Sequence, residues 1–287
     1  GHNMNTNIDE LSIATLRSLC IDMINRAKSG HPGMALGSAP ILYTLYTRHL
    51  IANPEDPSWI NRDRFVLSSG HASSLLYAIL HLCGYKITID DLKKFRQLGS
   101  ITPGHPEYGL TPGVDATSGP LGQGISQAVG MAVAERMVSH QYVHGDLLCS
   151  HYTYCLCGDG CLEEGISHEA ISFAGLQKLN KLILIYDSNN VTLDGALNLS
   201  SNDNQIARFK AAGWNTIEVK DGNNVNEIDN AIILAKKSKD KPTLILVHTI
   251  IGFGSINQGT NKVHGSPLSD EDIIRWNYRC EVRTRRN

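Results

Sequence analysis

Residues 152–165 read Tyr-Thr-Tyr-Cys-Leu-Cys-Gly-Asp-Gly-Cys-Leu-Glu-Glu-Gly, an apolar run that ends in a glycine-rich acidic turn. The run over 152–157 predicts a buried strand, and a helical pattern follows the turn over 164–176. A second apolar run, at 182–186, ends in polar residues that begin with Asp187. This strand–turn–helix–strand succession predicts two parallel strands joined by a helix.

The same alternation extends in both directions along the chain. Three more short apolar segments are predicted strands: 64–68, 214–219 and 243–249. Periodic segments predict helices over 9–28, 38–50, 72–82 and 225–238, with a helix of small residues from Gly122. We expect Asp9 to cap the first helix and Gly30 to end it. Together these elements predict an α/β fold, a mostly parallel sheet with helices on both faces.

Composition narrows the classes of partner. The chain has 287 residues, 41% of them hydrophobic, and a net charge of −2. A near-neutral chain without a basic block argues against nucleic acid or an anionic membrane as partner. No apolar stretch approaches the roughly 18 residues of a membrane span, and no signal peptide is recognised. We therefore expect one domain in the cytoplasm.

The two ends of the chain depart from this domain. Gly1 and His2 precede the methionine and suggest the remnant of a tag, so residues 1–8 are interpreted as tag remnant and lead-in. The domain is expected over 9–272. The polar, basic segment 273–287 shows no periodicity and is left as a tail of unclear origin.

The seven cysteines do not predict a metal or disulfide framework. Four of them lie close together in the sequence: Cys149, Cys155, Cys157 and Cys161. Their spacing lacks the paired Cys-x2-Cys elements of a zinc site. We expect reduced cysteines packed around a buried strand.

Polar residues follow two of the predicted strands at the edge where ligands bind in open α/β sheets. Asp159 offers a carboxylate oxygen, and Asn189 offers an amide oxygen from the neighbouring strand end. Gly158 and Gly160 allow the backbone to approach a phosphate group closely. One carboxylate and one amide suit Mg²⁺ that is shared with a diphosphate. A solvated acidic turn is the alternative for either motif taken alone.

Four of the twelve histidines lie in breaks flanked by glycine or proline: His31, His71, His105 and His264. Loops on a rigid scaffold are where binding groups concentrate, and an imidazole can donate a hydrogen bond to an alkoxide or exchange a proton. His105 lies in a glycine- and proline-rich stretch over 99–120 that has no periodicity. Three others are expected near a surface connection: His140, His144 and His151.

The Gly-Asp-Gly turn followed by Asn189-Asn190 resembles the signature of thiamine diphosphate enzymes. Six blocks in order narrow the resemblance to the diphosphate-binding half of the transketolase family, over about 9–272. The blocks lie at 29–33, 67–72, 102–107, 117–125, 158–165 and 262–268. The resemblance therefore implies the thiamine diphosphate-binding fold.

The resemblance also implies a cofactor site with named ligands. Asp159 and Asn189 would ligate Mg²⁺ together with the main-chain carbonyl of Val191, and Ca²⁺ or Mn²⁺ could substitute for it. Gly158 and Gly160 would lie against the diphosphate of the cofactor.

The histidines and the ring contacts receive roles from the same resemblance. His71 and His264 would contact the diphosphate and the adjoining substrate channel. His31 and His105 would face the reactive carbon of the thiazolium ring. The other matched positions are Gly119 and Leu121, which would line the cofactor rings, and Glu164, which would join a carboxylate network at a subunit interface.

The implied activity is transfer of a two-carbon glycolaldehyde unit from a ketose phosphate to an aldose phosphate, a reaction of the pentose phosphate pathway. A complete transketolase needs a pyrimidine-binding module that this chain lacks. We therefore expect a homodimer or pairing with a pyrimidine-binding half, and no turnover by the chain alone.

Two alternatives stay open at this point. One is half of another thiamine diphosphate synthase, such as deoxyxylulose phosphate synthase or dihydroxyacetone synthase. The other is a non-catalytic paralogue that keeps only the fold. A nicotinamide site is excluded because no Gly-x-Gly-x-x-Gly motif follows the first strand.

Overall fold

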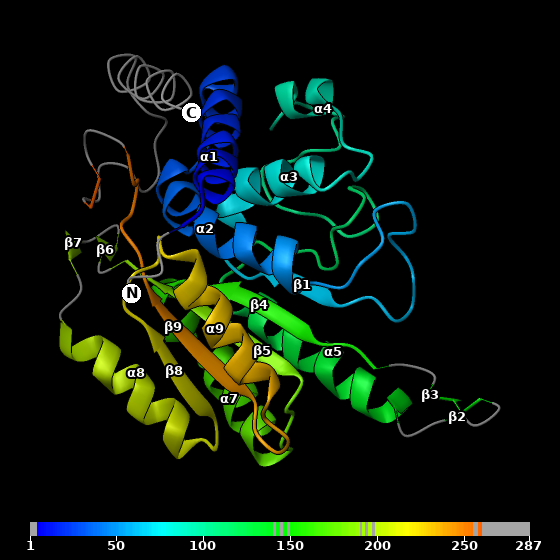
Figure 1. The fold of residues 1–287 in the computed structure, drawn as a ribbon, viewed down its shortest axis with the longest axis vertical. Helices are drawn as coiled ribbons and strands as arrows, with labels where there is room; N and C mark the ends of the chain where they lie inside the picture. The colour runs from blue at the N-terminus through cyan, green and yellow to red at the C-terminus, as the bar shows by residue number, and fades with distance from the viewer. Residues whose placement is uncertain are drawn as a thin grey trace.

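The computed structural model describes residues 5–139, 142–143, 146–147, 150–189, 191–192, 195–196, 199–254 and 258–259. A five-stranded parallel sheet forms its centre (Figure 1). The strand order is β1 (Arg64–Leu67), β4 (Thr153–Cys157), β5 (Leu182–Ser188), β9 (Thr243–His248) and β8 (Asn215–Val219). All four pairings are parallel, so the predicted sheet is confirmed. The two short antiparallel hairpins join β2 (Tyr142–Val143) to β3 (Asp146–Leu147) and β6 (Val191–Thr192) to β7 (Gly195–Ala196).

Helices cover both faces of the sheet, as predicted. One face packs against α1 (Asn7–Ala27), α2 (Pro32–Arg48), α3 (Ser73–Leu82) and α9 (Val225–Lys236). The opposite face packs against α5 (Gln123–Ser139), α7 (Gly165–Leu176) and α8 (Leu199–Ala211). Figure 1 shows α9 in front of the strands and α5 and α7 behind them. Short helical segments lie at Gly70–Ala72, at α4 (Ile89–Lys93) and at α6 (Asp159–Glu163).

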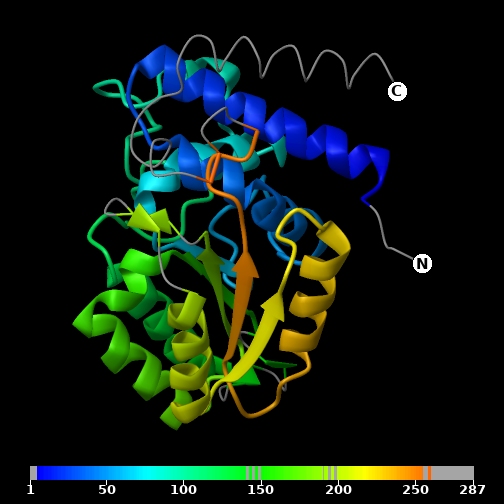
Figure 2. The same cartoon turned by 90° about the vertical axis from the view of Figure 1, so that its left-hand side faces the viewer.

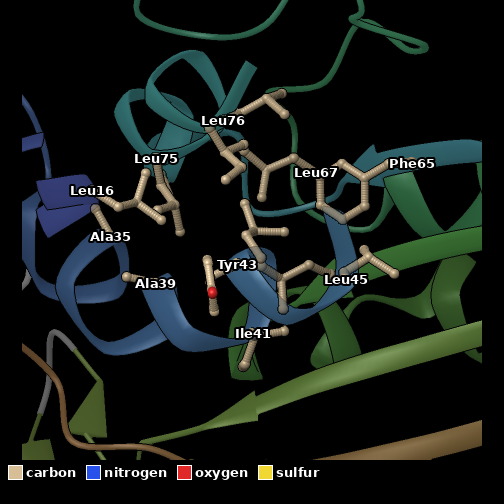
Figure 3. Packing of buried hydrophobic residues seen from close by; sticks show 14 of the residues in the cluster. Leu16, Ala35, Ala39, Ile41, Tyr43, Leu45, Phe65, Leu67, Leu75 and Leu76 are labelled. Atoms are coloured by element: carbon tan, nitrogen blue, oxygen red, sulfur yellow. The ribbon is translucent and has the colours of Figure 1, made fainter. Parts of the chain in front are cut away.

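Successive strand residues divide between the two cores because side chains alternate across a sheet. Phe65 and Leu67 of β1 join the core that contains α1, α2 and α3 (Figure 3), whereas Val66 joins the other. Cys155 and Cys157 of β4 are buried on the second face, and both are free. The prediction of reduced cysteines around a buried strand is therefore confirmed for these two residues and for Cys161, which is also free and buried in this core; Cys149 lies outside the described residues.

The first helix begins at Asn7, two residues before the predicted start at residue 9. Thr6, not Asp9, is the N-cap, because the Thr6 hydroxyl accepts a hydrogen bond from the Asp9 backbone N–H. The Asp9 carboxylate in turn accepts from the Thr6 backbone N–H, which completes a capping box. At the other end Lys28, in the left-handed conformation, caps the helix in place of Gly30.

The second helix begins at Pro32 and not at 38 as predicted. Proline fits the first turn of a helix, because the backbone N–H that it lacks would have no partner there. Pro32 can therefore start the helix although Gly33 and Gly37 follow it. Pro40 lies inside the helix. His31 consequently occupies the N-cap position of this helix.

His151 is a further correction, since it is buried and not part of a surface connection. It lies two residues before β4, and burial lowers the pKa of its imidazole to about 4. His140 and His144 lie outside the described residues. Within the described part of the chain, no helix combines the length and the apolar character needed to cross a membrane.

Three features position the candidate functional residues at one edge of the sheet. The arrowheads of β8 and β9 in Figure 2 point toward the half of the molecule that holds α1 to α4. Residues 94–122 contain turns and bends but no helix or strand, as the sequence predicts for 99–120. α5 then packs directly on the end of β1: a Cβ on Gly124 would lie 2.5 Å from the Cα atom of Ser68.

Candidate active site

The carboxyl ends of four parallel strands meet at one edge of the sheet. Ser68 and Ser69 follow β1, Gly158 follows β4, Asn189 follows β5 and Thr249 follows β9. Ligands of open α/β sheets bind at this edge because each strand delivers a loop there. The edge therefore brings together the two motifs that the sequence places far apart.

Asp159 has the most unusual environment at this edge. It is the first residue of α6, after the N-cap Gly158, and its Oδ1 atom is buried without any hydrogen-bond partner. Burial raises the pKa of its carboxyl to about 8, and the negative charges of Asp187 and Glu163 add to the shift. A buried acceptor without a partner is costly, so this oxygen is suited to a cation that the protein binds.

Asp187, near the end of β5, is a second buried carboxylate that the sequence interpretation did not single out. The Ser38 hydroxyl donates to its Oδ2 atom and the Thr249 hydroxyl donates to its Oδ1 atom. Burial raises its pKa to about 6, and the two hydroxyl donors oppose that shift. The available signal was an acidic residue that directly follows an apolar strand.

A side chain at either glycine of the turn would meet a close neighbour. A Cβ on Gly158 would lie 3.3 Å from the Ser69 hydroxyl oxygen. A Cβ on Gly160 would lie 3.2 Å from Cδ1 of Leu121, so the turn and the end of the 94–122 loop are adjacent. The structure thus brings Gly160 and Leu121 together, and their contact with a cofactor stays a prediction.

Three of the four candidate histidines lie in the described residues, and the segments that carry them lie close together. The rings of His31 and His71 are 5.3 Å apart between centroids, at an interplanar angle of 64°. A Cβ on Gly70 would lie 3.2 Å from Cδ2 of His105, and one on Gly119 would lie 3.7 Å from the same ring atom. His31, His71, His105 and Gly119 therefore line a common region beside the end of β1.

The loop that carries His105 is held against α3 by hydrogen bonds to its backbone. The Ser73 hydroxyl donates to the Gly104 carbonyl at 2.7 Å, and the Tyr77 hydroxyl donates to the Pro103 carbonyl at 2.7 Å. The backbone N–H of Ser118 donates to the Pro106 carbonyl at 3.2 Å. These bonds explain how a segment without regular structure can hold an imidazole in a fixed place.

Glu164 lies apart from the buried carboxylates. It is the exposed N-cap residue of α7, and its Cβ atom would lie 2.9 Å from a Cβ placed on Gly122. An exposed carboxylate at this edge is available to a partner surface. Its role at a subunit interface stays a prediction.

The donors at the site fit a metal that is shared with a diphosphate. Asp159 supplies an unpartnered carboxylate oxygen, and the half-buried Asn189 supplies an amide at the end of the next strand. Val191 lies in β6, and its carbonyl belongs to the segment that follows Asn189. In the described residues no group of three or more His, Cys, Asp or Glu side chains could hold an ion by itself. Mg²⁺ bound by so few protein ligands has room for oxygens of a bound diphosphate.

Two predicted features lie outside the described residues. His264 and its block at 262–268 belong to the segment 260–287, as does the tail at 273–287.

Comparison with known families agrees with the geometry of this edge. A family model described as the thiamine diphosphate binding domain of transketolase matches residues 8–282. The match extends beyond residue 272, where the sequence-based boundary was placed. The fold is thus that of a thiamine diphosphate-binding domain.

Individual relatives show which family of thiamine diphosphate-binding proteins the chain resembles. The transketolase of Geobacillus stearothermophilus is 56% identical over 279 residues, which cover 94% of this chain and 42% of that protein. The transketolase of Bacillus subtilis is 55% identical over 267 residues, covering 92% and 40%. The chain belongs to the transketolase family. It spans less than half the length of the curated relatives that it matches.

Solved structures agree with this assignment. A transketolase from Leishmania mexicana superposes with a TM-score of 0.91 at 47% identity, over 97% of this chain and 42% of that one. A transketolase from Campylobacter jejuni gives a TM-score of 0.90 at 48% identity, over 97% and 43%. The relatives and structures named here are all transketolases, and they favour that family over another thiamine diphosphate synthase.

Proposed function

We propose that this chain provides the diphosphate- and metal-binding half of a transketolase and acts together with a pyrimidine-binding half. The unpartnered, buried Oδ1 atom of Asp159 carries the proposal, because a carboxylate oxygen in that state needs a cation or a proton. Its place at a strand end, between two glycines that carry no side chain, suits a phosphorylated ligand. Family membership supports thiamine diphosphate as that ligand.

Mg²⁺ is the metal we propose, with Asp159, Asn189 and the main-chain carbonyl of Val191 as its protein ligands. All three are oxygen donors, which Mg²⁺ prefers, and the small number of protein ligands leaves positions for phosphate oxygens and water. Mn²⁺ and Ca²⁺ accept the same donors and should bind in its place. Gly158 and Gly160 would lie against the diphosphate.

The histidines would act on the substrate side of the site. His31 and His105, together with His264 from the segment beyond residue 260, would donate hydrogen bonds to the oxygens of the sugar donor. Removing one such donor from a preorganised site costs roughly a hundredfold to a thousandfold in rate. His71, beside His31, would contact the diphosphate. Gly119 and Leu121 would line the cofactor rings.

The reaction we propose is transfer of a two-carbon glycolaldehyde unit from a ketose phosphate to an aldose phosphate. Thiamine diphosphate supplies a thiazolium ring that stabilises a carbanion once it is bound. Sugar phosphates as substrates are supported by transketolases of Pichia stipitis, whose structures are described as complexes with xylulose 5-phosphate and sedoheptulose 7-phosphate. This chain's residues would orient the sugar and stabilise its developing negative charge.

The proposal includes a partner, because the chain corresponds to 42% of the length of the Geobacillus stearothermophilus transketolase. A homodimer of a longer protein, or pairing with a separate pyrimidine-binding half, would complete the active site. Glu164, exposed at the site edge, would contact that partner. A cytoplasmic location is the matching expectation, and cell fractionation would test it.

Calorimetric titration with thiamine diphosphate tests this proposal. We expect heat of binding in the presence of Mg²⁺, loss of that heat with a chelator, and loss in the Asp159→Ala variant. We also expect no measurable sugar-phosphate turnover by the chain alone. Metal-independent binding, or robust transfer by the purified chain, would contradict the proposal.

A further inference from the structure

Asp187 forms a buried bracket with two hydroxyl residues, and none of the roles above accounts for it. Asp187 is 1% exposed, and each of its carboxylate oxygens receives one hydroxyl hydrogen bond, from Ser38 and from Thr249. Ser38 lies in α2, Asp187 in β5, and Thr249 in the segment after β9. The three residues, hereafter the Ser38–Asp187–Thr249 bracket, therefore join three elements that are distant in sequence.

The sheet pairing fixes the direction in which Asp187 projects. Ile183 and Ile185 of the same strand lie in the core that contains α2, and residue 187 has the same parity. Ser188 pairs with His248, and the Thr249 backbone N–H donates to the Ser188 carbonyl at 3.0 Å. The ends of β5 and β9 are thus locked together beside Asp187, and Asn189 is the next residue after that lock.

α2 is docked on the segment after β9 by contacts that leave no room for side chains. A Cβ on Gly37 would lie 2.9 Å from the Ile250 carbonyl oxygen. The Gly252 backbone N–H donates to the Gly33 carbonyl at 2.9 Å. The bracket lies in this docked region, because Ser38 directly follows Gly37. His31, the N-cap of α2, is therefore held relative to the strand ends through the same contacts.

Asp187 is not arranged as a metal ligand in its own right. Both of its oxygens are already engaged by hydroxyl donors, whereas Oδ1 of Asp159 has no partner. Residues behind the direct ligands commonly fix the orientation of a metal site, and losing one lowers metal affinity about 10–100-fold. The bracket has the position that such a supporting group needs.

We propose that Asp187 is a positioning residue, which uses Ser38 and Thr249 to hold Asn189 and the start of α2 in register for binding the metal and the cofactor diphosphate. This inference rests on the proposed function, since it names a support for the site proposed there. It predicts that each hydroxyl contributes to metal affinity although neither touches the metal.

Paramagnetic Mn²⁺ with thiamine diphosphate is the probe for this role, because the electron paramagnetic resonance signal of free Mn²⁺ falls as the ion binds. Titrations of the full chain would compare Ser38→Ala and Thr249→Val, each of which removes one hydroxyl, with the wild type. We expect the dissociation constant for Mn²⁺ to rise about tenfold or more in both variants. Thr249→Ser restores the hydroxyl, so we expect near-wild-type affinity from it.

Thr44→Val is the matched control. Thr44 is also a buried hydroxyl of α2, but it donates to the Pro40 carbonyl and not to Asp187. We expect that variant to keep the wild-type affinity for Mn²⁺. Unfolding by urea, followed by circular dichroism, would be measured on every variant.

The outcomes separate this inference from the proposed function. Unchanged affinity in both Ser38→Ala and Thr249→Val would overturn the positioning role and leave the proposed function intact. Loss of affinity that merely follows loss of cooperative unfolding, with Thr249→Ser equally affected, would also overturn it. Absence of Mn²⁺ binding by the wild-type chain in the presence of thiamine diphosphate would refute the proposed function, and the inference with it.

Discussion

The two edges of the sheet use the same residue types for opposite purposes. At the amino edge, Asp63 accepts hydrogen bonds from the backbone N–H groups of Ile51 at 2.9 Å and Tyr152 at 2.8 Å. Asp115 accepts there from the Phe65 N–H and from the Arg62 side chain. At the carboxyl edge, Oδ1 of Asp159 accepts from no group.

Burial alone does not distinguish these carboxylates. Burial raises the pKa of Asp63 and of Asp115 as well as that of Asp159, but backbone N–H donors oppose the shift at the amino edge. At Asp159 the neighbouring charges of Asp187 and Glu163 add to the shift and do not oppose it. The hydrogen-bond partners, and not the extent of burial, therefore distinguish a structural carboxylate from one suited to bind a ligand.

Removing the carboxylate at the carboxyl edge should produce the largest effect on binding. For Asp159→Ala we expect metal-dependent affinity for thiamine diphosphate to fall by more than about 100-fold, since a direct ligand should matter more than its supports. Stability should stay the same or rise, because an unsatisfied buried group is lost. Calorimetry and urea unfolding measure the two quantities; a large loss of stability without loss of binding would contradict the comparison.

The reverse pattern is expected for Asp63→Ala at the amino edge. Two backbone N–H groups would lose their acceptor, so we expect the free energy of unfolding to fall by about 2 kcal/mol or more. Affinity for the cofactor, measured where the variant is still folded, should be unchanged. Asp63→Asn keeps one acceptor oxygen and should show a smaller loss. Equal stabilities of Asp63→Ala and wild type in urea would show that the hydrogen bonds of Asp63 do not stabilise this edge.

Close packing under the site provides a third test. Gly124→Ala would place a Cβ 2.5 Å from the Cα atom of Ser68, so we expect a loss of about 1–3 kcal/mol and weaker cofactor binding. Gly130→Ala lies in the same helix with nothing within 4 Å of the added Cβ and should stabilise the chain by up to about 1 kcal/mol. Thermal unfolding of the pair checks the contrast, and destabilisation of both by the same amount would argue against it.

The smallest effect at neutral pH is expected from His151 at the amino edge. Burial lowers the pKa of His151 from 6.5 to about 4, so between these values the unfolded chain binds a proton that the folded chain does not. Stability from this group is therefore complete above about pH 6.5 and falls on acidification, by at most about 1.4 kcal/mol per pH unit. His151→Gln should remove this pH dependence, and it should change the free energy of unfolding less at pH 7.5 than at pH 5. Parallel pH profiles of the two proteins would exclude the effect.

The sheet could be predicted from sequence because each strand is a compact apolar run between turn signals, as at 153–157 and 182–188. Helix starts were harder, because capping depends on a few side chains. Thr6 and Asp9 share one capping box, and only the geometry shows which residue is the cap. The start of α2 was missed because Pro32 and the glycines after it suggest a loop, although proline is well suited to the first turn.

The candidate site was predictable in its motifs but not in its supports. The Gly-Asp-Gly turn and the histidine loops carry distinctive residues, so the sequence could point to them. Asp187 could not be distinguished from any acidic residue after a strand, because its partners, Ser38 and Thr249, come from distant segments. The burial of His151 was missed for the same reason, since tertiary packing decides it.

Anomalous diffraction from crystals of the chain grown with Mn²⁺ and thiamine diphosphate tests the central claim most directly. We predict one strong manganese peak at the carboxyl edge of the sheet, within bonding distance of Oδ1 of Asp159, of the Asn189 amide oxygen and of the Val191 carbonyl. The diphosphate density should adjoin that peak along Gly158 and Gly160. Bound cofactor with no manganese at Asp159, or a peak confined to another carboxylate such as Asp63, would contradict the account.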